Sequence, residues 1–374
     1  MIKYQSFNIV YLNYQKKFSI IMKGVILHAG HGTRLRPLTH TGPKQLLPIA
    51  NKPMSNYCVD TLIQAGIKEI AFIIGGIGSQ KVKEFYGNGD KFGVKFSYIE
   101  QDYPKGIAHA ISLCKNFIDG EKFIVFLGDN IINKDISEYI INFQKSNVEA
   151  SLLLCEVDNP SQFGIAEIKN NKIIKIVEKP KNPITNFAVT GIYCLTSHIF
   201  EIIDKLKPSW RNELEISDAL QMLIENNEEL TFEMITDYWK DTGTPKDIIQ
   251  ANRKILESMK EFQKGIIEKD VIISGKVMIG QGTKIKKGVK ITGPVIIGEN
   301  CIIEENSEIK ENSSIGDDCK IVGTTISNSI IMSNCIFEGK FEIKNSIVGS
   351  NSRISQNNVL NNEFLLGEGS QISI

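Results

Sequence analysis

The stretch over residues 28–54 concentrates the side chains best suited to binding phosphate. It reads HAGHGTRLRPLTHTGPKQLLPIANKPM and follows a short apolar run, GVIL. Gly30 and Gly32 carry no Cβ, so their backbone N–H groups can approach an anion closely. Arg34 and Lys44 add positive charge. Taken alone, the stretch is either a loop that binds phosphates or a basic connection in an α/β protein. The motifs in the rest of the chain distinguish these two interpretations.

Phosphate recognition has to come from local cations, because the chain carries no net charge. Its 374 residues include 43 basic and 43 acidic ones, so no global field favours nucleic acid or an anionic membrane. The seven cysteines are scattered and form no CxxC pair, which argues against a zinc site or disulfide framework and fits a reducing cytoplasm. No apolar run approaches the ~20 residues of a membrane span. Residues 1–21 lack the apolar core of a signal peptide, and we expect this extension to carry no function.

Two periodicities divide the chain after that extension. Over residues 22–259, apolar runs such as IAFIIGG and KFIVFLGDN alternate with amphipathic helical patterns. This alternation predicts an α/β domain with a Rossmann-like, mainly parallel mixed sheet. Ligands bind beyond the carboxyl ends of such strands. The opening loop, residues 75–76 and residues 128–130 all follow apolar runs, so we expect the opening loop to line a site.

The remaining residues, 260–374, follow a six-residue repeat. Isoleucine recurs at a strict step of six at positions 267, 273, 279, 285, 291, 297, 303, 309, 315 and 321. An α-helix would smear such a step around its axis, whereas a left-handed parallel β-helix takes six residues per side. The register slips around VGTTISNSI and resumes less regularly to about Ile354.

This repeat domain offers little chemistry of its own. Related β-helices are often acyltransferases that use a histidine base, but the five histidines, at 28, 31, 40, 109 and 198, all precede the repeat. We therefore expect a rigid assembly or regulatory module rather than acetyl transfer, and a homo-oligomer of unknown copy number.

The motifs before the repeat resemble those of the sugar-1-phosphate nucleotidylyltransferases. GHGTRLRPLT, GPKQLLPIANKPM, LGDN, FGIAEI, VEKP, AVTGIY and WKDTGTP appear in that family's order between residue 23 and about residue 255. With the hexapeptide tail, the chain looks like the long form of glucose-1-phosphate thymidylyltransferase.

The resemblance implies joining a sugar 1-phosphate to the α-phosphate of a nucleoside triphosphate, with release of pyrophosphate. The nucleophile is already an oxyanion, so catalysis rests on charge neutralisation and in-line positioning rather than on a general base. The residue set fits, because it offers glycines, cations and carboxylates for Mg²⁺.

By resemblance, Arg34 contacts the pyrophosphate leaving group and Lys44 the α-phosphate. The nucleotide side also includes Gly30, Gly32, Thr33, Gln45, Gln101 and Gly106, the last three where the family contacts the pyrimidine. Asp129 and Asp241 match the metal ligands. The hexose and its phosphate would be held by Gly164, Glu178, Lys179, Gly191, Tyr193 and Trp239, with Lys179 also counted as catalytic.

One departure from the family pattern concerns the start of the loop. The usual LAGGxGTR is LHAGHGTR here, so Ala29 replaces a glycine and His28 precedes it. Because alanine tolerates positive φ poorly, either Ala29 keeps a negative φ or the loop is rebuilt. We expect His28 and His31 to be packed or solvent-facing rather than bound to phosphate or base.

Several functions fit these residues. We favour dTDP-glucose synthesis from dTTP and glucose 1-phosphate; UTP with glucose 1-phosphate is the alternative, and guanylyl transfer to mannose 1-phosphate ranks lower. A bifunctional nucleotidylyltransferase/acetyltransferase is a further possibility. A non-catalytic regulatory homologue would be expected to have lost charged site residues, yet Arg34, Lys44, Asp129, Lys179 and Asp241 are all present.

Overall fold

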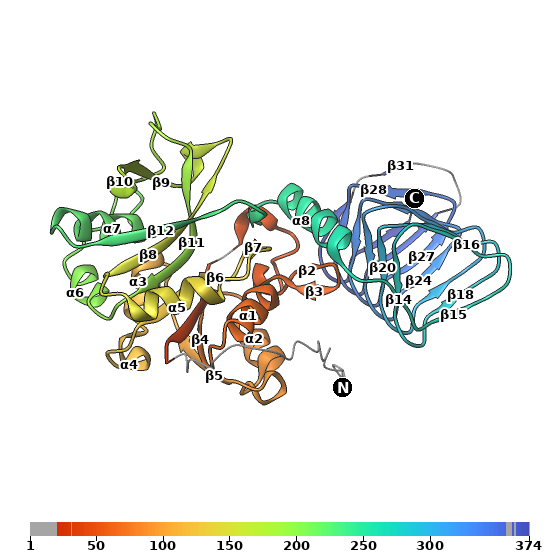
Figure 1. Ribbon diagram of the computed structural model, residues 1–374. Coiled ribbons are helices and arrows are strands. Elements are labelled where there is room, and N and C mark those ends of the chain that lie inside the picture. Colours follow the sequence, from red (N-terminus) through yellow and green to blue (C-terminus); the bar gives the residue numbers. More distant parts are fainter. Residues whose placement is uncertain (1–20, 31, 357–360, 363, 374) are drawn as a thin grey trace.

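The computed structural model describes residues 21–30, 32–356, 361–362 and 364–373. An α/β region and a β-helix lie side by side, and helix α8 (Pro245–Ser258) lies between them (Figure 1). Except for Ile21, the expected extension 1–21 lies outside the described residues, as does His31. None of the described helices combines the length and apolar composition needed to cross a membrane.

A nine-stranded mixed sheet forms the centre of the α/β region. Its main path runs β10-β9-β11-β6-β1-β4-β5, with β8 and β12 added beside β11. Strands β1, β4, β5 and β6 are parallel, whereas β11 runs antiparallel to β6. The bounds are β1 (Lys23–Leu27), β4 (Glu69–Ile74), β5 (Lys95–Glu100), β6 (Phe123–Leu127), β8 (Ala150–Glu156), β9 (Gly164–Lys169), β10 (Lys172–Glu178), β11 (Phe187–Leu195) and β12 (Leu230–Ile235).

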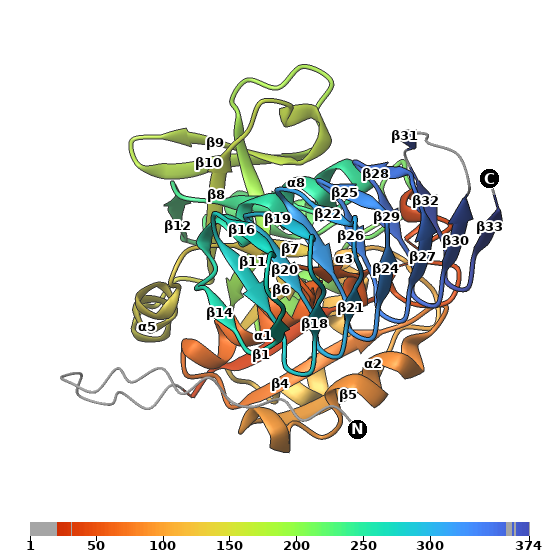
Figure 2. The same ribbon diagram turned by 90° about the vertical axis from the view of Figure 1, so that its right-hand side faces the viewer.

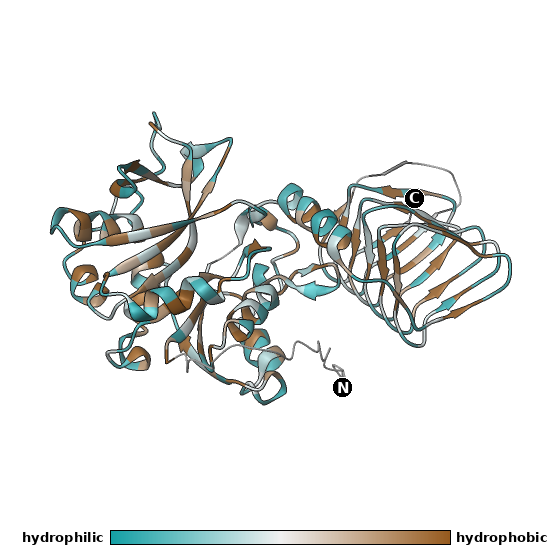
Figure 3. Cartoon of the chain, in the orientation of Figure 1, coloured by the Kyte–Doolittle hydropathy of each residue, from teal (hydrophilic) through white to brown (hydrophobic). Residues whose placement is uncertain are grey.

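Helices cover the sheet because its strands are apolar on both faces. Val25 and Ile26, neighbours in β1, pack into two different hydrophobic clusters, one on each side of the sheet. Figure 3 shows hydrophobic residues gathered in the strands and hydrophilic ones on outer turns. The prediction of a Rossmann-like mixed sheet is confirmed. The helices are α1 (Met54–Gln64), α2 (Ser79–Tyr86), α3 (Ile107–Ser112), α4 (Lys115–Ile118), α5 (Ser137–Lys145), α6 (Ile199–Ile203) and α7 (Ile216–Glu225).

Short elements at the edge of this sheet position the loops. The 3-10 helices are η1 (Thr33–Leu35), η2 (Lys44–Leu46), η3 (Asp90–Phe92) and η4 (Pro160–Gln162). Two small antiparallel pairs join β2 (Pro48–Ile49) with β3 (Lys52–Pro53), and β7 (Asn130–Ile132) with β13 (Trp239–Asp241).

The second region is a β-helix with three parallel sheets, as the six-residue repeat predicts (Figure 2). The first sheet contains β14 (Phe262–Gln263), β17 (Val277–Ile279), β20 (Val295–Ile297), β23 (Ser313–Ile315), β26 (Ile330–Ile331), β29 (Ile347–Val348) and β32 (Leu365–Leu366). The second contains β15 (Ile266–Ile267), β18 (Lys284–Ile285), β21 (Ile302–Ile303), β24 (Lys320–Val322), β27 (Ile336–Gly339), β30 (Arg353–Gln356) and β33 (Gln371–Ser373). The third contains β16 (Ile272–Ser274), β19 (Lys290–Thr292), β22 (Glu308–Ile309), β25 (Thr325–Ser327), β28 (Glu342–Lys344) and β31 (Asn361–Asn362).

The repeated isoleucines point inward and stack coil upon coil. Ile279 pairs with Ile297, and Ile297 with Ile315, so each coil takes three six-residue sides. The next partner of Ile315 is Ile331, which makes that coil two residues shorter and accounts for the slip in register. Pairing continues past Ile354 to Ile372, farther than the regular pattern extends in the sequence.

Candidate active site

A pocket of about 160 Å³ opens near the carboxyl ends of the central strands. Its walls come from the β6–β7 junction, β9, β10, β11, β13 and the start of α7. The lining residues are Ile107, Leu127, Asp129, Asn130, Gln162, Phe163, Gly164, Ile176, Glu178, Lys179, Val189, Thr190, Gly191, Tyr193, Glu215, Ile216, Ser217, Leu220, Trp239 and Asp241. All the residues predicted to hold the sugar phosphate, and both predicted metal ligands, are in this set.

The two aspartates meet because β7 and β13 pair. Asp129 lies between β6 and β7, and Asp241 ends β13 opposite Asn130. Gly128 makes this turn possible, because a Cβ there would lie 2.8 Å from the Leu27 carbonyl oxygen. The backbone N–H of Thr242 donates to the Asp129 carbonyl at 3.1 Å and holds the two segments together. Two carboxylates far apart in sequence therefore share one edge of the pocket.

Lys44 from the opening loop reaches this carboxylate pair and forms an ion pair with Asp129. Burial would raise the pKa of Asp129, but the Lys44 ammonium together with the hydrogen bonds to the carboxylate holds that pKa below its ordinary value. Burial and the negative charge of Asp129 raise the pKa of Asp241 to about 6. The pair is thus short of positive charge even with Lys44 in place.

Arg34 approaches the same edge from η1. A Cβ placed on Gly243 would lie 3.4 Å from both terminal nitrogens of Arg34, so the guanidinium packs over the backbone just beyond Asp241. The side chain is otherwise exposed. Both cations of the opening loop therefore gather beside the two aspartates, which favours the phosphate-binding interpretation of the loop over a mere basic connection.

The start of the loop keeps its turn without the family's first glycine. Gly30 and Gly32 have φ of 125° and 57°, whereas Ala29 is not among the residues with positive φ. Of the two alternatives for Ala29, the negative φ is therefore the one observed. The Thr39 hydroxyl donates to the Gly32 carbonyl at 2.8 Å and closes the loop, and Thr33 is exposed at the start of η1.

His28 packs inside the domain instead of facing the site. It is 1% exposed and lies edge-on to Phe72, with ring centroids 5.1 Å apart. Neither ring nitrogen has a hydrogen-bond partner among the described residues. Burial lowers the pKa of His28 to about 3, so the ring is neutral.

The three residues expected to contact the base lie outside the pocket lining. Gln45 is 1% exposed, and its Oε1 has no hydrogen-bond partner in the part of the chain that the structure describes. Gln101 is buried, with its Nε2 2.8 Å from the Nδ1 of His109. Gly106 precedes α3 with φ of 103°, and a Cβ there would lie 2.4 Å from the Leu214 carbonyl oxygen.

The sugar side is organised around Glu178 at the end of β10. The Ser217 hydroxyl donates to its Oε2 at 2.9 Å, and the Lys179 ammonium lies 3.6 Å from its Oε1. Burial is the largest influence on the Glu178 carboxyl and raises its pKa. Gly164 leaves room for this carboxylate, since a Cβ there would lie 3.2 Å from Oε2. Lys179 itself has φ of 42°, a strained conformation of the kind that clusters at functional sites.

Strand β11 and β13 form the opposite wall. Gly191 has φ of 72°, and any Cβ there would lie 2.5 Å from Leu127 Cδ1. Tyr193 is buried two residues later. The indole N–H of Trp239 donates to Asn130 Oδ1 at 2.7 Å and to the Thr190 carbonyl at 3.1 Å, which fixes the ring against the pocket.

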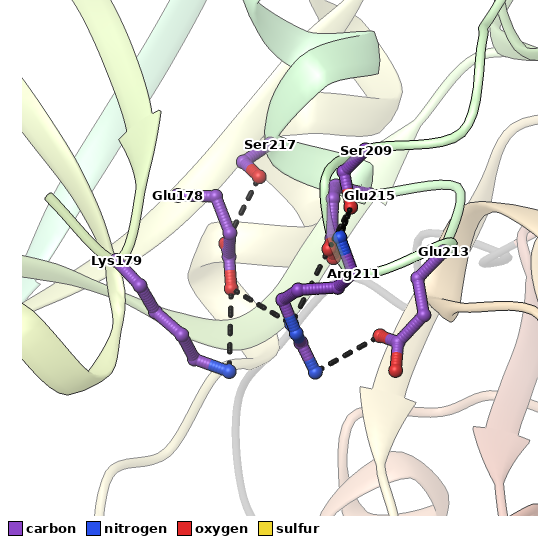
Figure 4. A network of polar contacts seen from close by, with 7 residues as sticks. All are labelled: Glu178, Lys179, Ser209, Arg211, Glu213, Glu215 and Ser217. Atoms are coloured by element: carbon purple, nitrogen blue, oxygen red, sulfur yellow. Dashed lines mark hydrogen bonds and ion pairs between the residues drawn. The ribbon is translucent and has the colours of Figure 1, made fainter.

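Sequence reasoning missed Arg211 and the loop that carries it. Its guanidinium lies 3.6 Å from Glu178, 3.0 Å from Glu213 and 3.3 Å from Glu215 (Figure 4). Glu215 is 4% exposed and also accepts from the Ser209 hydroxyl. The sequence signal for Arg211 was the stretch WRNELEIS, residues 210–217, a charge cluster directly before a helical pattern.

The donors near the pocket suit a hard divalent cation that also binds substrate. Mg²⁺ takes one or two carboxylates and completes its shell with phosphate oxygens and water. Asp129 and Asp241 offer two carboxylates, and the raised pKa of Asp241 reflects charge that a cation would neutralise. No group of three or more His, Cys, Asp or Glu able to hold a metal occurs within the described ranges. The residues fit Mg²⁺ bound together with a phosphate.

Comparison with protein families and known proteins agrees with this geometry. Residues 23–258 match the model of the nucleotidyl transferase family, and residues 291–373 match the GMPPB C-terminal domain. The chain is 40% identical to the low-salt glycan biosynthesis nucleotidyltransferase Agl11 of Haloferax volcanii, over 94% of this chain and 100% of that protein. It is 36% identical to a glucose-1-phosphate thymidylyltransferase of Streptomyces antibioticus, over 94% of this chain and 99% of that protein.

Solved structures resemble about two thirds of the chain. A Bacillus anthracis protein assigned as a glucose-1-phosphate thymidylyltransferase, crystallised with sucrose, is 41% identical with a TM-score of 0.61, and covers 65% of this chain and 98% of its own. A UDP-glucose pyrophosphorylase complexed with UDP-glucose is 27% identical with a TM-score of 0.59, and covers 64% of this chain and 100% of its own.

Proposed function

The chain belongs to the nucleotidyl transferase family, as a sugar-1-phosphate nucleotidyltransferase, and from that premise we propose that it makes dTDP-glucose from dTTP and glucose 1-phosphate. A phosphate oxygen of the sugar phosphate attacks the α-phosphorus of the nucleotide. The bond from that phosphorus to the bridging oxygen breaks, and pyrophosphate leaves. No proton has to be removed from the nucleophile, which is why no histidine or cysteine is needed.

One observation carries the proposal: Arg34 and Lys44 gather at the edge of a pocket whose far wall is built for a polar, ring-shaped ligand. Glu178 offers a carboxylate to hydroxyl groups, and Trp239 and Tyr193 supply flat apolar surface. We assign Lys179 and Arg211, both within 3.6 Å of Glu178, to the phosphate of the sugar. The nucleotide phosphates then lie against Arg34 and Lys44, on the other side of the aspartates.

Mg²⁺ is part of the proposal, with Asp129 and Asp241 as its protein ligands. When bound, the ion supplies positive charge to the nucleotide phosphates and helps orient them. Lys44 stays beside Asp129, and Arg34 remains free to meet the outer phosphates. What these side chains do is hold the reactants in line and neutralise charge that develops on the leaving group.

Base preference is the finer part of the proposal. Glutamine matches the imide edge that thymine and uracil share, so Gln45 and Gln101 suit a pyrimidine without separating dTTP from UTP. We rank dTTP first because relatives similar over nearly the whole chain carry that activity in their names. The resemblance to a UDP-glucose pyrophosphorylase keeps UTP as the second candidate. Homo-oligomerisation and a cytoplasmic location stay predictions.

A pyrophosphate-release assay tests the proposal. It crosses dTTP, UTP, GTP and ATP with the 1-phosphates of glucose, mannose and glucosamine, with Mg²⁺ and with chelator. We expect the highest kcat/KM with dTTP and glucose 1-phosphate and none with chelator. A best pair containing UTP or GTP would replace the proposed substrates, and no release with any pair would favour a regulatory homologue. Addition of acetyl-CoA and glucosamine 1-phosphate tests acetyl transfer, for which we expect no turnover.

A further inference from the structure

One side of the β-helix is apolar on its outer surface. In the first sheet, Val277 and Ile279 point into the β-helix core, so Met278 between them points outward. The outward column continues coil by coil in register, as Met278, Ile296, Ser314, Ile330 and Ile347. All five are at most 6% exposed. We call these five residues the docking face.

The corresponding column of the second sheet is different. Its outward residues include Ile266, Lys284, Ile302, Lys320, Ile336 and Arg353, which are exposed or half-buried. The outward face of the second sheet is therefore polar or partly exposed. The docking face is buried because something covers it.

The cover is the back of the opening loop together with α8. Ile330 and Ile347 share a hydrophobic cluster with Leu35 and Leu38. Leu35 directly follows Arg34 and is 1% exposed. Farther along, a Cβ on Gly367 would lie 3.2 Å from the Pro37 carbonyl oxygen, so the last coils also touch the loop backbone. The front of the loop carries Arg34 toward the aspartates, and its back rests on the β-helix.

The segment that follows Lys44 is held in the same way. Strands β2 and β3 form a hairpin whose two turn residues, Ala50 and Asn51, have φ of 47° and 61°. An alanine is strained in this left-handed conformation, so its surroundings have to impose it. Ala50 is 2% exposed and packs with Met278 and Ile296.

A buried amide ties this hairpin to the β-helix. Asn252 of α8 accepts hydrogen bonds from the Ala50 N–H at 2.8 Å and the Ser314 hydroxyl at 2.6 Å, and donates to the Asn312 carbonyl at 3.1 Å. The Asn51 side chain adds a donation to the Ile315 carbonyl at 2.5 Å. The turn of the β2–β3 hairpin belongs to the opening stretch, residues 28–54, yet it contacts the β-helix rather than the pocket.

The sugar side has no such support. Within the described ranges, neither of the two clusters at the docking face includes a residue of β9, β10, β11 or α7. Those elements pack into the core of the α/β region instead.

From this difference we propose that the β-helix is a positioning element for catalysis: through Ile347, and through the hydrogen bonds of Ser314 and Asn312 with Asn252 of α8, it sets the place of Arg34 and Lys44. It would thereby control nucleotide binding without affecting sugar-phosphate binding. The inference rests on the proposed function for its assay. It gives the repeat domain a role in the reaction that does not require chemistry of its own.

Ile347→Ala in the full chain tests this inference, with Ile302→Ala, an outward isoleucine of the second sheet, as the matched control. We expect Ile347→Ala to raise the KM for nucleotide about fivefold to tenfold, since small displacements of positioned groups cost this much or more. The KM for sugar phosphate should change less than about twofold, and Ile347→Leu should restore most of the loss. Equal changes in both KM values, or none in either, would overturn the inference.

A second measurement is independent of turnover. Hydrogen–deuterium exchange should become faster over residues 33–49 in Ile347→Ala and stay unchanged in β9 and β10. If Ile347→Ala does not fold, Ser314→Ala removes only the hydroxyl bond to Asn252 and should accelerate exchange over the same residues to a smaller extent. Unchanged exchange there would contradict the inference. If the unaltered chain itself shows no turnover, the proposed function is contradicted. The exchange experiment would then still test whether the β-helix supports the opening loop.

Discussion

The two halves of the candidate site are built in different ways. The sugar half stands on neighbouring strands of one sheet, with Glu178 at the end of β10 and Gly191 and Tyr193 within β11. The nucleotide half stands on short 3-10 turns that carry Arg34 and Lys44 and are packed from behind by a second region of the chain. Strands hold side chains through their own sheet, whereas such turns need an outside surface. Because the two halves are supported differently, binding of the two substrates should respond to different perturbations.

The largest effect should come from the residue that both halves share. Asp129→Asn keeps the shape but removes the charge that pairs with Lys44 and would bind Mg²⁺. We expect kcat to fall at least about 100-fold with every substrate pair, because charge stabilisation of the leaving group is lost. Pyrophosphate release measured over a range of Mg²⁺ concentrations checks this.

Asp158→Asn, an exposed aspartate, is the control for Asp129→Asn and should behave like the unaltered chain. If Asp129→Asn kept more than about one tenth of the activity, the carboxylate pair would not be the centre of catalysis.

Arg34→Ala should have a smaller effect on activity, limited to the nucleotide substrate. A hydrogen bond to a charged group contributes about 1.5–3 kcal/mol, so the nucleotide KM, or kcat/KM, should worsen roughly tenfold or more. The KM for sugar phosphate should hardly move, since Arg34 lies near Gly243 and outside the pocket lining. Initial rates with each substrate varied in turn separate the two.

Arg36→Ala serves as the control, because Arg36 is an exposed arginine on the same loop. An equal loss in both arginine variants would indicate general electrostatic steering instead of a specific contact.

Glu178→Gln should give the mirror image on the sugar half. Glutamine keeps the shape and can still accept from Ser217, but loses the charge that attracts Lys179 and Arg211. We expect the KM for sugar phosphate to rise about fivefold, with nucleotide KM unchanged. Since the pKa of Glu178 is raised above its ordinary 4.5, the unaltered chain should also lose sugar-phosphate affinity as pH falls toward that raised pKa.

The Gln variant should lack that acidic limb, and a pH profile of both KM values measures it. A limb that persists in Glu178→Gln would assign the titration to another group.

The sequence predicts features that follow a local pattern, but it does not predict contacts between residues far apart in the chain. Apolar runs and the six-residue isoleucine step depend on neighbouring residues only, and both predicted architectures are confirmed. The β7–β13 pairing joins residues more than a hundred positions apart, so only the resemblance could bring Asp241 to Asp129. Arg211 was missed because its partner Glu178 is on another element. The role of Asn51 in docking depends on a contact with Ile315 that no local pattern contains.

His28 should influence acid stability, and of the residues considered it should affect activity near neutral pH the least. His28, buried at the start of the opening stretch, has its pKa lowered to about 3 by burial. The unfolded chain takes up this proton below pH 6.5 while the folded chain does not, so stability falls as pH drops from 6.5 toward 3, by about 1.4 kcal/mol per pH unit. The raised pKa of Glu178 changes stability in the opposite direction. The folded state binds this proton more readily than the unfolded chain, so stability rises as pH falls toward 4.5.

His28→Phe, which keeps a ring against Phe72, should reduce the loss of stability at acid pH, as measured by urea unfolding at pH 7 and pH 5. The exposed His40→Gln should leave the slope unchanged. An unaltered slope in His28→Phe would mean that the ring of His28 gains a proton in the folded chain, and the assignment of the acid-side loss to His28 would be wrong.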